Sequence, residues 1–363
     1  MPDSELSAAA AQAVTDGTVA GMVVALGRSS EVTYCRAFGQ AALVPTRQAM
    51  TEKSLFDLAS LTKVLATTTL TMRLWDRDGI DLDQPLGSLA PGRYPADKAG
   101  LTPRLLLTHA AGLPPHVPFQ HQFPPDAGDP DRVREEVLAR VRQVPLAQPP
   151  GTATVYSDLG MVLLGDLLET LMGLPLDQAF ESEVAAPLGL RDTFFIHLGR
   201  PLAKAIRPPE AFAATEQCAW RGRVVRGQVH DENAFLLQGV AGHAGLFSTA
   251  GEVAVLAGEI LASLARDGAL LSPRAAREMV TPQPIAGTAT RALGWGLNGP
   301  GASCGSRFSP RAFGHTGFTG TSVWLDPEDQ RFVVLLANRV HPSRDNDRFL
   351  RLRPILHDLA LNG

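Results

Sequence analysis

The segment TSVWLDPEDQRFVVLLANR (residues 321–339) decides the fold, because two apolar stretches flank the polar turn DPEDQ. This pattern predicts a β-hairpin. Two further apolar stretches, AGMVVALGR (20–28) and VTYCRAFGQA (32–41), lie near the N-terminus with only SSE between them. Hairpins at both ends of the chain predict one antiparallel sheet to which both ends contribute.

The segments beside and between these hairpins have helical patterns. Apolar residues recur at helical spacing in 4–14, 61–79, 159–173, 175–189, 250–268, 272–280 and 347–361. The predicted fold class is therefore α+β, with an antiparallel sheet flanked by helices and a mostly helical middle region. We expect a single unit over residues 1–363, with a sheet subdomain (about 1–59 and 240–363), a helical subdomain (about 60–239) and a cleft between them.

The composition excludes some classes of partner. The chain has 363 residues, of which 45% are hydrophobic, and a net charge of −4. It is long enough to bury a sizeable core, and no basic excess favours nucleic acid or an anionic membrane. No apolar run reaches the ~18 residues that span a bilayer. The expected partner is a small-molecule or peptide substrate, and the oligomeric state is left open.

The N-terminus and the cysteines bear on the cellular compartment. The start MPDSELSAAAAQAV lacks the basic region and apolar core of a signal peptide. A cytoplasmic location is therefore expected, with an exported mature form left open. Cys35, Cys218 and Cys304 are scattered and odd in number, which fits neither a disulfide framework nor a metal site. No metal and no cofactor is expected.

Ser60 and Lys63, in the stretch SLTK (60–63), are the first candidates for chemistry. Lys63 is one of only four lysines and stands at the start of an apolar helical run. Their spacing places both side chains on nearly the same face of a helix. A partly desolvated lysine can have a lowered pKa and hydrogen-bond the serine hydroxyl, which activates a nucleophile. The alternative is a helix N-cap serine and a lysine whose ammonium reaches solvent.

Two later stretches offer partners for this pair. Tyr156 lies in VYSDLG (155–160) at the start of a predicted helix, where the alternative role is a packing aromatic with Asp158 as N-cap. His315 lies in FGHTGFTGTSVWLD (313–326), where glycines leading into a strand let a substrate approach the backbone closely. The alternative there is a bulged strand start with a solvent-facing histidine.

The three elements, in this order, resemble those of the penicillin-recognising serine hydrolases. This family includes class C β-lactamases, D-alanyl-D-alanine carboxypeptidases, esterases and D-aminopeptidases, and it carries Ser-x-x-Lys, Tyr-x-Asn and Lys/His-Thr-Gly. LLTHAAGLPP (106–115) and PLGLRDTFF (187–195) also resemble the group. VHDENAFLLQGVAGHAGLFSTAGEVA (229–254) is similar to a low-molecular-weight penicillin-binding-like subgroup. The resemblance runs from about residue 15 to the end of the chain.

The resemblance implies acyl transfer through a covalent serine ester. Ser60 would be the nucleophile, and Lys63 and Tyr156 would handle its proton, with the formal base left open between them. The backbone N–H groups of Ser60 and Phe318 would form the oxyanion hole. His315 would polarise Tyr156 or meet a substrate carboxylate.

Asp158, Thr316 and Gly317 are the implied substrate-binding residues. Asp158 replaces the asparagine of the family, and His315 replaces the lysine that is common in lactamases. An ionised carboxylate only accepts hydrogen bonds, so contact with an acylamino carbonyl would be lost. The same carboxylate could instead hold a free ammonium, as a D-aminopeptidase would need.

The implied function is a serine hydrolase that acts through an acyl-enzyme on a small ester or amide, related to β-lactamases and penicillin-binding proteins. The enzymatic alternatives are a carboxylesterase or a D-aminopeptidase rather than a β-lactamase or carboxypeptidase. The alternative outside enzymes is a catalytically silent, penicillin-binding-like sensor.

Other reactive residue types have simpler explanations. GASCG (301–305) fits the Gly-x-Ser-x-Gly pattern but lacks the preceding strand and following helix which that motif requires. Ser303 and Cys304 are therefore expected in a loop, with nothing to lower the pKa of Cys304. A structural polar turn is expected at His230, Asp231 and Glu232, and a role in the wall of the pocket is the alternative. Four further histidines are expected to be solvated or structural, namely His116 and His121 in the long, pocket-shaping loop 112–130, and His109 and His243.

Overall fold

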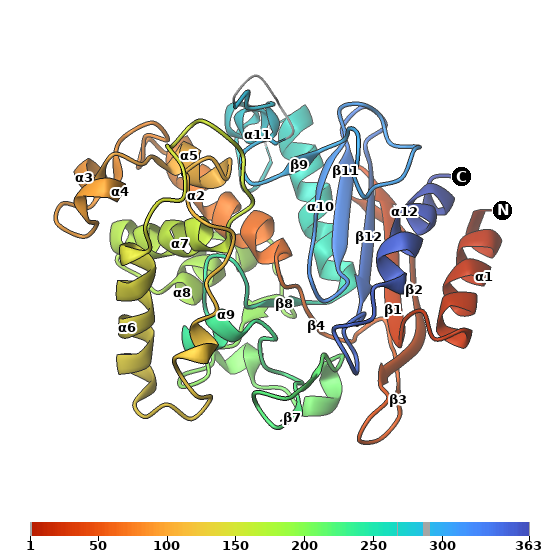
Figure 1. The fold of residues 1–363 in the computed structure, drawn as a ribbon. Helices are drawn as coiled ribbons and strands as arrows, with labels where there is room; N and C mark the ends of the chain where they lie inside the picture. Colours follow the sequence, from red (N-terminus) through yellow and green to blue (C-terminus); the bar gives the residue numbers. More distant parts are fainter. Residues whose placement is uncertain (1, 267, 286–290, 363) are drawn as a thin grey trace.

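The computed structural model describes residues 2–266, 268–285 and 291–362, and its architecture confirms the predicted α+β class (Figure 1). A seven-stranded sheet has the order β3-β2-β1-β12-β11-β10-β9, and its neighbouring strands pair antiparallel. Its strands are β1 (Gly21–Arg28), β2 (Glu31–Ala42), β3 (Gln48–Ala49), β9 (Gly296–Leu297), β10 (Phe313–Thr316), β11 (Ser322–Asp326) and β12 (Arg331–Ala337). The N-terminal and C-terminal hairpins meet where β1 pairs with β12, so both chain ends build the sheet as predicted.

Both faces of the central strands are buried, which explains the continuous apolar runs in β1, β11 and β12. Successive side chains of a strand point to opposite faces. Val23 belongs to the core that α10 (Ala250–Ala265) covers, whereas its neighbour Val24 belongs to a second core with α1 (Pro2–Thr15) and α12 (Arg348–Ala360). Figure 1 shows α10 on one side of the sheet and α1 and α12 on the other.

The middle of the chain is mostly helical, as predicted, and lies beside the sheet on the side of α10 (Figure 1). The remaining α-helices are α2 (Thr69–Asp76), α3 (Leu86–Leu89), α4 (Ala96–Ala99), α5 (Pro103–Leu107), α6 (Pro130–Gln143), α7 (Asp158–Met172), α8 (Leu176–Phe180), α9 (Glu232–Leu236) and α11 (Pro273–Val280). Two small sheets are formed by β4 (Phe56–Asp57), β8 (Leu246–Ser248) and β5 (Phe194–Phe195), and by β6 (Gln217–Cys218) and β7 (Arg223–Val224). The boundaries of the two subdomains stay a prediction.

The apolar helix α7 begins one residue earlier than its sequence pattern suggests. The Ser157 side chain accepts a hydrogen bond from the Gly160 backbone N–H at 3.4 Å and caps the helix. The interpretation of Asp158 as N-cap is therefore wrong, and Asp158 is the first helical residue.

Within the described residues, no single helix has the length and apolar character for a membrane span. Only α7 joined to Leu176–Ala185, across a bend of 75°, passes that test of length and composition.

The helix after Ser60 starts in an unusual way. Leu61 and Thr62 are helical, and Lys63–Thr68 then form a π-helical segment before α2. Ser60 directly precedes this helix, at the N-cap position, and in the described residues its hydroxyl contacts Lys63 Nζ at 2.8 Å instead of a backbone N–H. Short π-helical segments are frequent at functional sites, and this one directly follows the predicted nucleophile.

Candidate active site

The turn that presents Ser60 is held by a buried carboxylate. Ala59 has a φ of 47°, in the left-handed region that residues other than glycine rarely adopt. Asp57 accepts hydrogen bonds from the backbone N–H groups of Ala59 at 2.8 Å and His230 at 2.6 Å. Burial raises the pKa of Asp57, although these hydrogen bonds lower it in part. Strained turns persist where their surroundings hold them, which is typical of functional sites.

Lys63 is fully buried and contacts the Ser60 hydroxyl. Its Nζ lies 2.8 Å from Ser60 Oγ, 2.8 Å from Asp158 Oδ1 and 3.1 Å from the His243 carbonyl oxygen. Burial lowers the pKa of Lys63, but the charges of Asp158 and Tyr156 outweigh this effect and raise it. Lys63 is therefore an ammonium. The interpretation that the Lys63 ammonium reaches solvent is therefore wrong. The interpretation that its pKa is lowered is also wrong, because Asp158 supplies a counter-charge.

A glycine allows the His243 carbonyl to reach Lys63. A Cβ on Gly242 would lie 2.0 Å from the carbonyl oxygen of Met161 in α7, so the chain can pass this close only without a side chain. The Gly242 carbonyl in turn accepts a hydrogen bond from Thr67 Oγ1 at 2.7 Å. The π-helical segment and α7 thus position the carbonyl that receives a hydrogen bond from Lys63.

Tyr156 lies among aromatic rings and cations. Its ring centroid is 4.6 Å from that of His109 and 5.8 Å from that of His315. Lys63 Nζ lies 5.0 Å from the ring centroid, and the Arg291 guanidinium carbon lies 5.1 Å from it. The predicted partners of the nucleophile are therefore neighbours in space, and Arg291 joins them without having been predicted.

His315 is a neutral histidine with one free ring nitrogen. Its Nδ1 lies 2.9 Å from the Thr316 carbonyl oxygen, and because a carbonyl only accepts, Nδ1 carries the proton. Nε2 is buried and has no hydrogen-bond partner among the described residues. Burial, followed by the charges of Arg291 and Lys63, holds the pKa of His315 well below its usual range. His315 is therefore not a solvent-facing residue, and it brings a lone pair rather than a positive charge to the site.

Two backbone amides at the nucleophile are free. Across the described part of the chain, neither the Ser60 nor the Phe318 backbone N–H has a hydrogen-bond acceptor. Gly317 allows the end of β10 to approach the nucleophile turn, because a Cβ there would lie 2.5 Å from the Leu58 carbonyl oxygen. Free donors of this kind suit an oxyanion hole, and the role of these two stays a prediction.

Both carboxylate oxygens of Asp158 have cationic or polar neighbours. Oδ1 binds Lys63, and Oδ2 lies 3.4 Å from His116 Nδ1. Burial raises the pKa of Asp158, but Lys63 and His116 together lower it below its usual range, so the carboxylate is ionised. His116 was expected to be solvated. It is exposed, as expected, and it also lines the pocket, where its contact with Asp158 raises its pKa.

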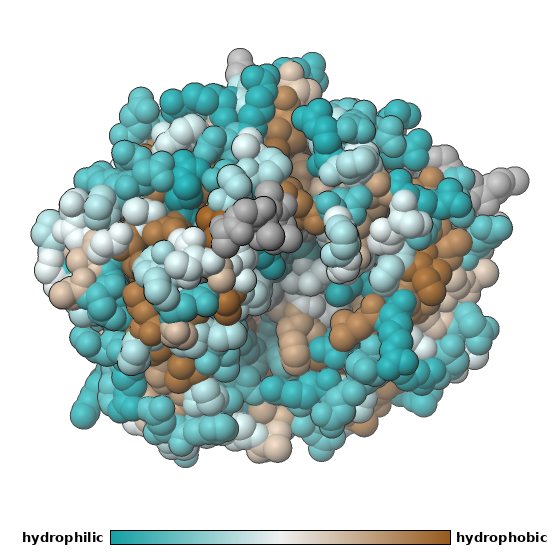
Figure 2. Space-filling model, turned by 45° about the horizontal axis from the view of Figure 1, so that its top comes forward, coloured by the Kyte–Doolittle hydropathy of each residue, from teal (hydrophilic) through white to brown (hydrophobic). Residues whose placement is uncertain are grey.

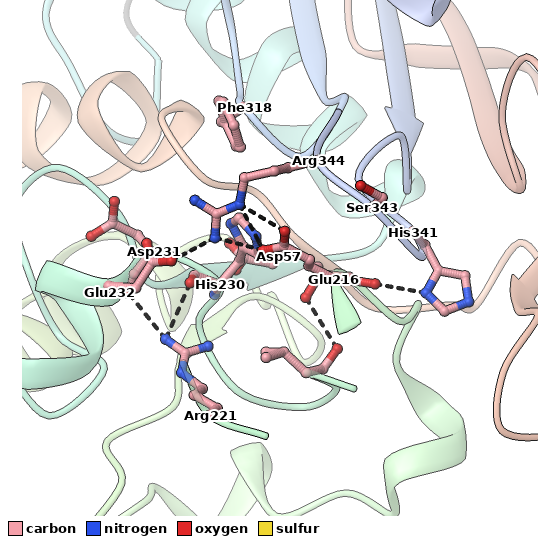
Figure 3. Close-up of polar contacts among 12 residues, drawn as sticks. Asp57, Glu216, Arg221, His230, Asp231, Glu232, Phe318, His341, Ser343 and Arg344 are labelled. Atoms are coloured by element: carbon pink, nitrogen blue, oxygen red, sulfur yellow. Dashed lines mark hydrogen bonds and ion pairs between the residues drawn. The ribbon is translucent and has the colours of Figure 1, made fainter. Parts of the chain in front are cut away.

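Phe318 forms a wall of the pocket above a network of charges (Figure 3). Its ring stacks on the His230 ring at a centroid distance of 5.7 Å. Below it, Arg344 Nε lies 2.8 and 2.7 Å from the two carboxylate oxygens of Glu216, and its guanidinium also contacts Glu232. His230 Nε2 lies 3.0 Å from Glu216. The polar turn at these residues is structural, as expected, and it also lines the pocket.

One group of potential metal ligands lies in this network. Ligand atoms of Glu216, Cys218 and Glu232 lie within 4.8 Å of one another. Arg344 already pairs with both carboxylates. Because the guanidinium balances their charge, this group is explained as an ion-pair network and does not suit a metal ion.

The predicted site residues meet in one pocket of about 970 Å³. Figure 2 shows the surface hollowed near the middle of the face it draws. The residues of the prediction that line the pocket are Ser60, Tyr156, Asp158, His315, Thr316, Gly317 and Phe318. Lys63 lies beneath Ser60 in the protein interior.

The competing candidates lie where they were expected. Ser303 is in a loop, although it lines the same pocket, and burial raises the pKa of Cys304 to about 11. His109 Nδ1 accepts a hydrogen bond from a backbone N–H at 3.2 Å, and His243 Nε2 lies 2.8 Å from Asp231. Both histidines therefore have the structural hydrogen bonds that were predicted.

Sequence reasoning missed three side chains of the site, Asp57, His116 and Arg291. The Pro- and His-rich character of loop 112–130 was the one available signal, because it predicted a pocket-shaping loop and contains His116. Asp57 and Arg291 belong to no recognisable local motif. Their roles arise from contacts with distant parts of the chain.

The chain is similar to known hydrolases over most of its length. It is 33% identical over 330 residues to an N-acetylmuramyl-L-alanine amidase of Bacillus subtilis (strain 168), across 85% of this chain and 73% of that protein. It is 32% identical over 346 residues to a putative D-alanyl-D-alanine carboxypeptidase of Escherichia coli (strain K12), across 86% of this chain and 77% of that protein.

A similar solved structure and a matching family model agree with these relatives. The solved structure of EstCE1, a hydrolase with promiscuous acyltransferase activity, matches with a TM-score of 0.72 at 24% identity, over 97% of this chain and 98% of that one. A family model described as Beta-lactamase matches residues 6–355. The chain therefore belongs to the Beta-lactamase family and is a serine hydrolase that acts through an acyl-enzyme.

Proposed function

We propose that the protein hydrolyses short esters and amides at Ser60, with Tyr156 as the base that takes the serine proton. The contact of Lys63 with both Ser60 and Asp158 carries this proposal. An ammonium has no lone pair to accept a proton, so the ion pair with Asp158 leaves Lys63 as a hydrogen-bond donor. Tyr156 faces this ammonium and is the remaining candidate for the base.

Acylation then follows from the positions of these groups. The Ser60 oxygen attacks the substrate carbonyl carbon while Tyr156, in its phenolate form, takes the hydroxyl proton and becomes a phenol. Negative charge develops on the carbonyl oxygen, and the free N–H groups of Ser60 and Phe318 would bind it, each contributing about 3 kcal/mol. The tetrahedral intermediate breaks its bond to the alcohol or amine, which leaves with the proton from Tyr156. Water then attacks the serine ester in the same way and releases the acid.

Asp158 favours simple esters and amides over β-lactams with an acylamino side chain. Its two oxygens face Lys63 and His116, and a carboxylate cannot donate a hydrogen bond to an acylamino carbonyl. We therefore expect slow or negligible turnover of cephalosporins. Because Lys63 already balances the charge of Asp158, a substrate ammonium is not required there, which disfavours the D-aminopeptidase alternative.

The names of the relatives support hydrolysis of amides as well as esters. An amidase and a putative D-alanyl-D-alanine carboxypeptidase both match more than four fifths of this chain. The substrate panel for this protein therefore combines p-nitrophenyl esters, D-alanyl peptides and nitrocefin. If Ser60 is labelled but the protein turns over none of these substrates, the result would instead favour the silent sensor.

A fluorophosphonate probe and p-nitrophenyl butyrate test the assignment of the nucleophile. We expect the wild type to be labelled on Ser60 and to hydrolyse the ester, and Ser60→Ala to lose both. Ser303→Ala removes the serine of the competing Gly-x-Ser-x-Gly pattern and should keep both. Labelling that maps to Ser303, or full activity in Ser60→Ala, would show that the assignment is wrong.

A further inference from the structure

Tyr156 has two cations beside its ring, and only one of them has a carboxylate partner. Lys63 Nζ lies 5.0 Å from the ring centroid, and the Arg291 guanidinium carbon lies 5.1 Å from it. Asp158 pairs with Lys63 at 2.8 Å, so this pair carries no net charge. Within the described residues no carboxylate pairs with Arg291, and its Nη1 is buried without a hydrogen-bond acceptor. Arg291 therefore brings an unbalanced positive charge to the ring.

The two histidines beside Tyr156 add no charge. Nδ1 of His109 accepts a hydrogen bond from the Ser157 N–H at 3.2 Å, so it carries no proton. His315 donates from Nδ1 to a carbonyl oxygen, and its Nε2 is a free lone pair. Burial, followed by the charge of Arg291, holds the pKa of both rings well below the usual range. Arg291 is thus the uncompensated charge among the groups named here that face Tyr156.

A tight turn holds Arg291 in this position. The N–H of the next residue, Ala292, donates to the Trp295 carbonyl oxygen at 3.0 Å. Gly294 lies inside this turn with a φ of 76°, and a Cβ there would lie 2.2 Å from Thr68 Oγ1. The turn therefore packs directly against the π-helical segment, which begins with the other cation of the site.

The surroundings of Arg291 favour a negative charge close by. Burial lowers the pKa of Arg291, and the charge of Tyr156 raises it in part. A guanidinium is not deprotonated in proteins, so the positive charge persists at neutral pH. The interaction of this charge with a neighbour is strong, because little water screens groups in the protein interior. A phenolate at Tyr156 would supply the missing counter-charge.

We propose that Arg291 is a positioning residue that acts through Tyr156, because its guanidinium stabilises the phenolate that takes the Ser60 proton. This inference deepens the hydrolase function proposed above and rests on it. In the transfer, the bond between hydrogen and Ser60 Oγ breaks and a bond to the Tyr156 oxygen forms. The negative charge passes to the substrate carbonyl oxygen. Arg291 exchanges no proton and sets the fraction of Tyr156 that is ready to act as a base at neutral pH.

The pH dependence of kcat/KM for p-nitrophenyl butyrate tests this role. An opposite charge about 4–6 Å away typically moves a titration by about one to three pH units. In Arg291→Gln we therefore expect the acid limb of the profile to move up by about one to two pH units. Activity should fall by roughly 10- to 100-fold at neutral pH and recover at alkaline pH. Arg291→Lys keeps the charge and should retain much of the wild-type profile.

A second arginine over an aromatic ring provides the matched control. The Arg274 guanidinium carbon lies 4.3 Å from the Trp75 ring centroid, and its side chain is 59% exposed on α11. Arg274→Gln removes the same charge and the same type of contact, and it should keep the wild-type profile. An Arg291→Gln profile that coincides with the wild type would overturn the proposal. A loss by the same factor at every pH would also overturn it, because a purely structural role has that effect.

The near-ultraviolet absorbance of tyrosinate gives a readout that does not depend on turnover. The chain has only three tyrosines, and burial raises the pKa of Tyr94. The difference spectrum between the wild type and Tyr156→Phe isolates the signal of Tyr156. With increasing pH, the tyrosinate band should appear earlier in this pair than in the same pair carrying Arg291→Gln. Appearance at the same pH in both pairs would contradict the proposal.

The two readouts separate this inference from the assignment of the base. Wild-type rates in Tyr156→Phe would overturn that assignment, while the tyrosinate band would still show whether Arg291 stabilises the phenolate. If Tyr156→Phe is inactive but Arg291→Gln shifts neither the profile nor the band, the role of Arg291 alone is overturned.

Discussion

Two clusters of buried charge involve α7, and only one of them lies at the active site. Asp166 is fully buried and accepts hydrogen bonds from Arg93 at 2.6 and 3.0 Å and from Arg142 at 2.5 and 3.1 Å. Asp158, at the start of the same helix, lies 2.8 Å from the buried Lys63. Buried opposite charges at short distance are common to both clusters and so do not by themselves mark a site.

The clusters differ in the hydrogen-bonding groups that remain unused. Both oxygens of Asp166 accept from two guanidinium groups, so its charge is balanced inside the cluster. Lys63 contacts the hydroxyl of Ser60, which borders a pocket of about 970 Å³ together with the free N–H of Phe318. Reactive and unpaired groups beside open space, rather than buried charge, distinguish a catalytic cluster from a structural one.

The largest expected effect is the loss of activity when Lys63 or Tyr156 is changed. We expect Lys63→Ala and Tyr156→Phe each to lower kcat/KM for p-nitrophenyl butyrate by about 10³-fold or more, within the range typical of proton-transfer and nucleophile-activating groups. Because both act on the proton of Ser60, the double variant should lose little more than the worse single variant. Strict additivity of the two losses, or wild-type rates in either single variant, would remove the residues from a shared network.

The structural cluster should respond in stability rather than in activity. Asp166→Asn leaves two half-buried guanidinium groups without their anion and should lower the free energy of unfolding by roughly 2–3 kcal/mol, as the loss of hydrogen bonds to a charged group does. Its kcat/KM at low temperature, where the protein is folded, should stay within about twofold of the wild type. Urea unfolding monitored by circular dichroism, with ester kinetics on the same samples, measures both.

An exposed pair provides the control for this experiment. Asp83 also binds a guanidinium, that of Arg104, at 2.7 Å, but its side chain is 62% exposed. Asp83→Asn should therefore cost at most about 1 kcal/mol. A large loss of kcat/KM in folded Asp166→Asn would show that the two clusters are not functionally distinct.

Asp158→Asn should change substrate preference by a smaller factor. The amide can donate a hydrogen bond to an acylamino carbonyl, which the carboxylate cannot. We expect the ratio of kcat/KM for nitrocefin to that for p-nitrophenyl butyrate to rise by about ten- to a hundredfold, since one recovered hydrogen bond contributes ~1–3 kcal/mol. A wild type that cleaves nitrocefin near 10⁶ M⁻¹s⁻¹, well within the usual enzyme range, would contradict this reading of Asp158.

The smallest expected effect concerns a buried histidine, His357, that belongs to neither the catalytic nor the structural cluster. Burial, and then the charge of Arg353, lower the pKa of His357 to about 3. Its ordinary pKa is about 6.5, so below that pH the unfolded chain binds a proton that the folded protein does not. The contribution of neutral His357 to the free energy of unfolding is therefore complete above pH 6.5, and it is lost as the pH falls below that value.

A comparison of three proteins measures this pH dependence. Between pH 7.5 and 5.5 the wild type should lose roughly 1 kcal/mol through His357, and His357→Gln should show a shallower fall in Tm. His121→Gln, which changes an exposed loop histidine, serves as the control and should follow the wild type. Parallel curves for His357→Gln and the wild type would show that His357 does not cause the acid sensitivity.

Local patterns in the sequence were sufficient for the main elements. The hairpins at the two chain ends and the helices around them follow from the spacing of apolar residues, because a strand or helix has the same period wherever it lies. The pairing of Ser60 with Lys63 follows for the same reason, since three-residue spacing places them together in any helix-like segment. The prediction of the capping residue of α7 was wrong because Ser157 and Asp158 are adjacent residues that can both cap a helix, and no pattern distinguishes them.

The sequence by itself determined the sheet from both chain ends, the helical middle and the Ser60–Lys63 pair, because these depend on neighbours along the chain. Only the tertiary structure decided the charge of Lys63, since Asp158 and the His243 carbonyl reach it from distant segments. It likewise decided that Arg291 lies over the Tyr156 ring. The physical reason is that the pKa and pairing of a buried group depend on every element packed around it, and no local period records those contacts.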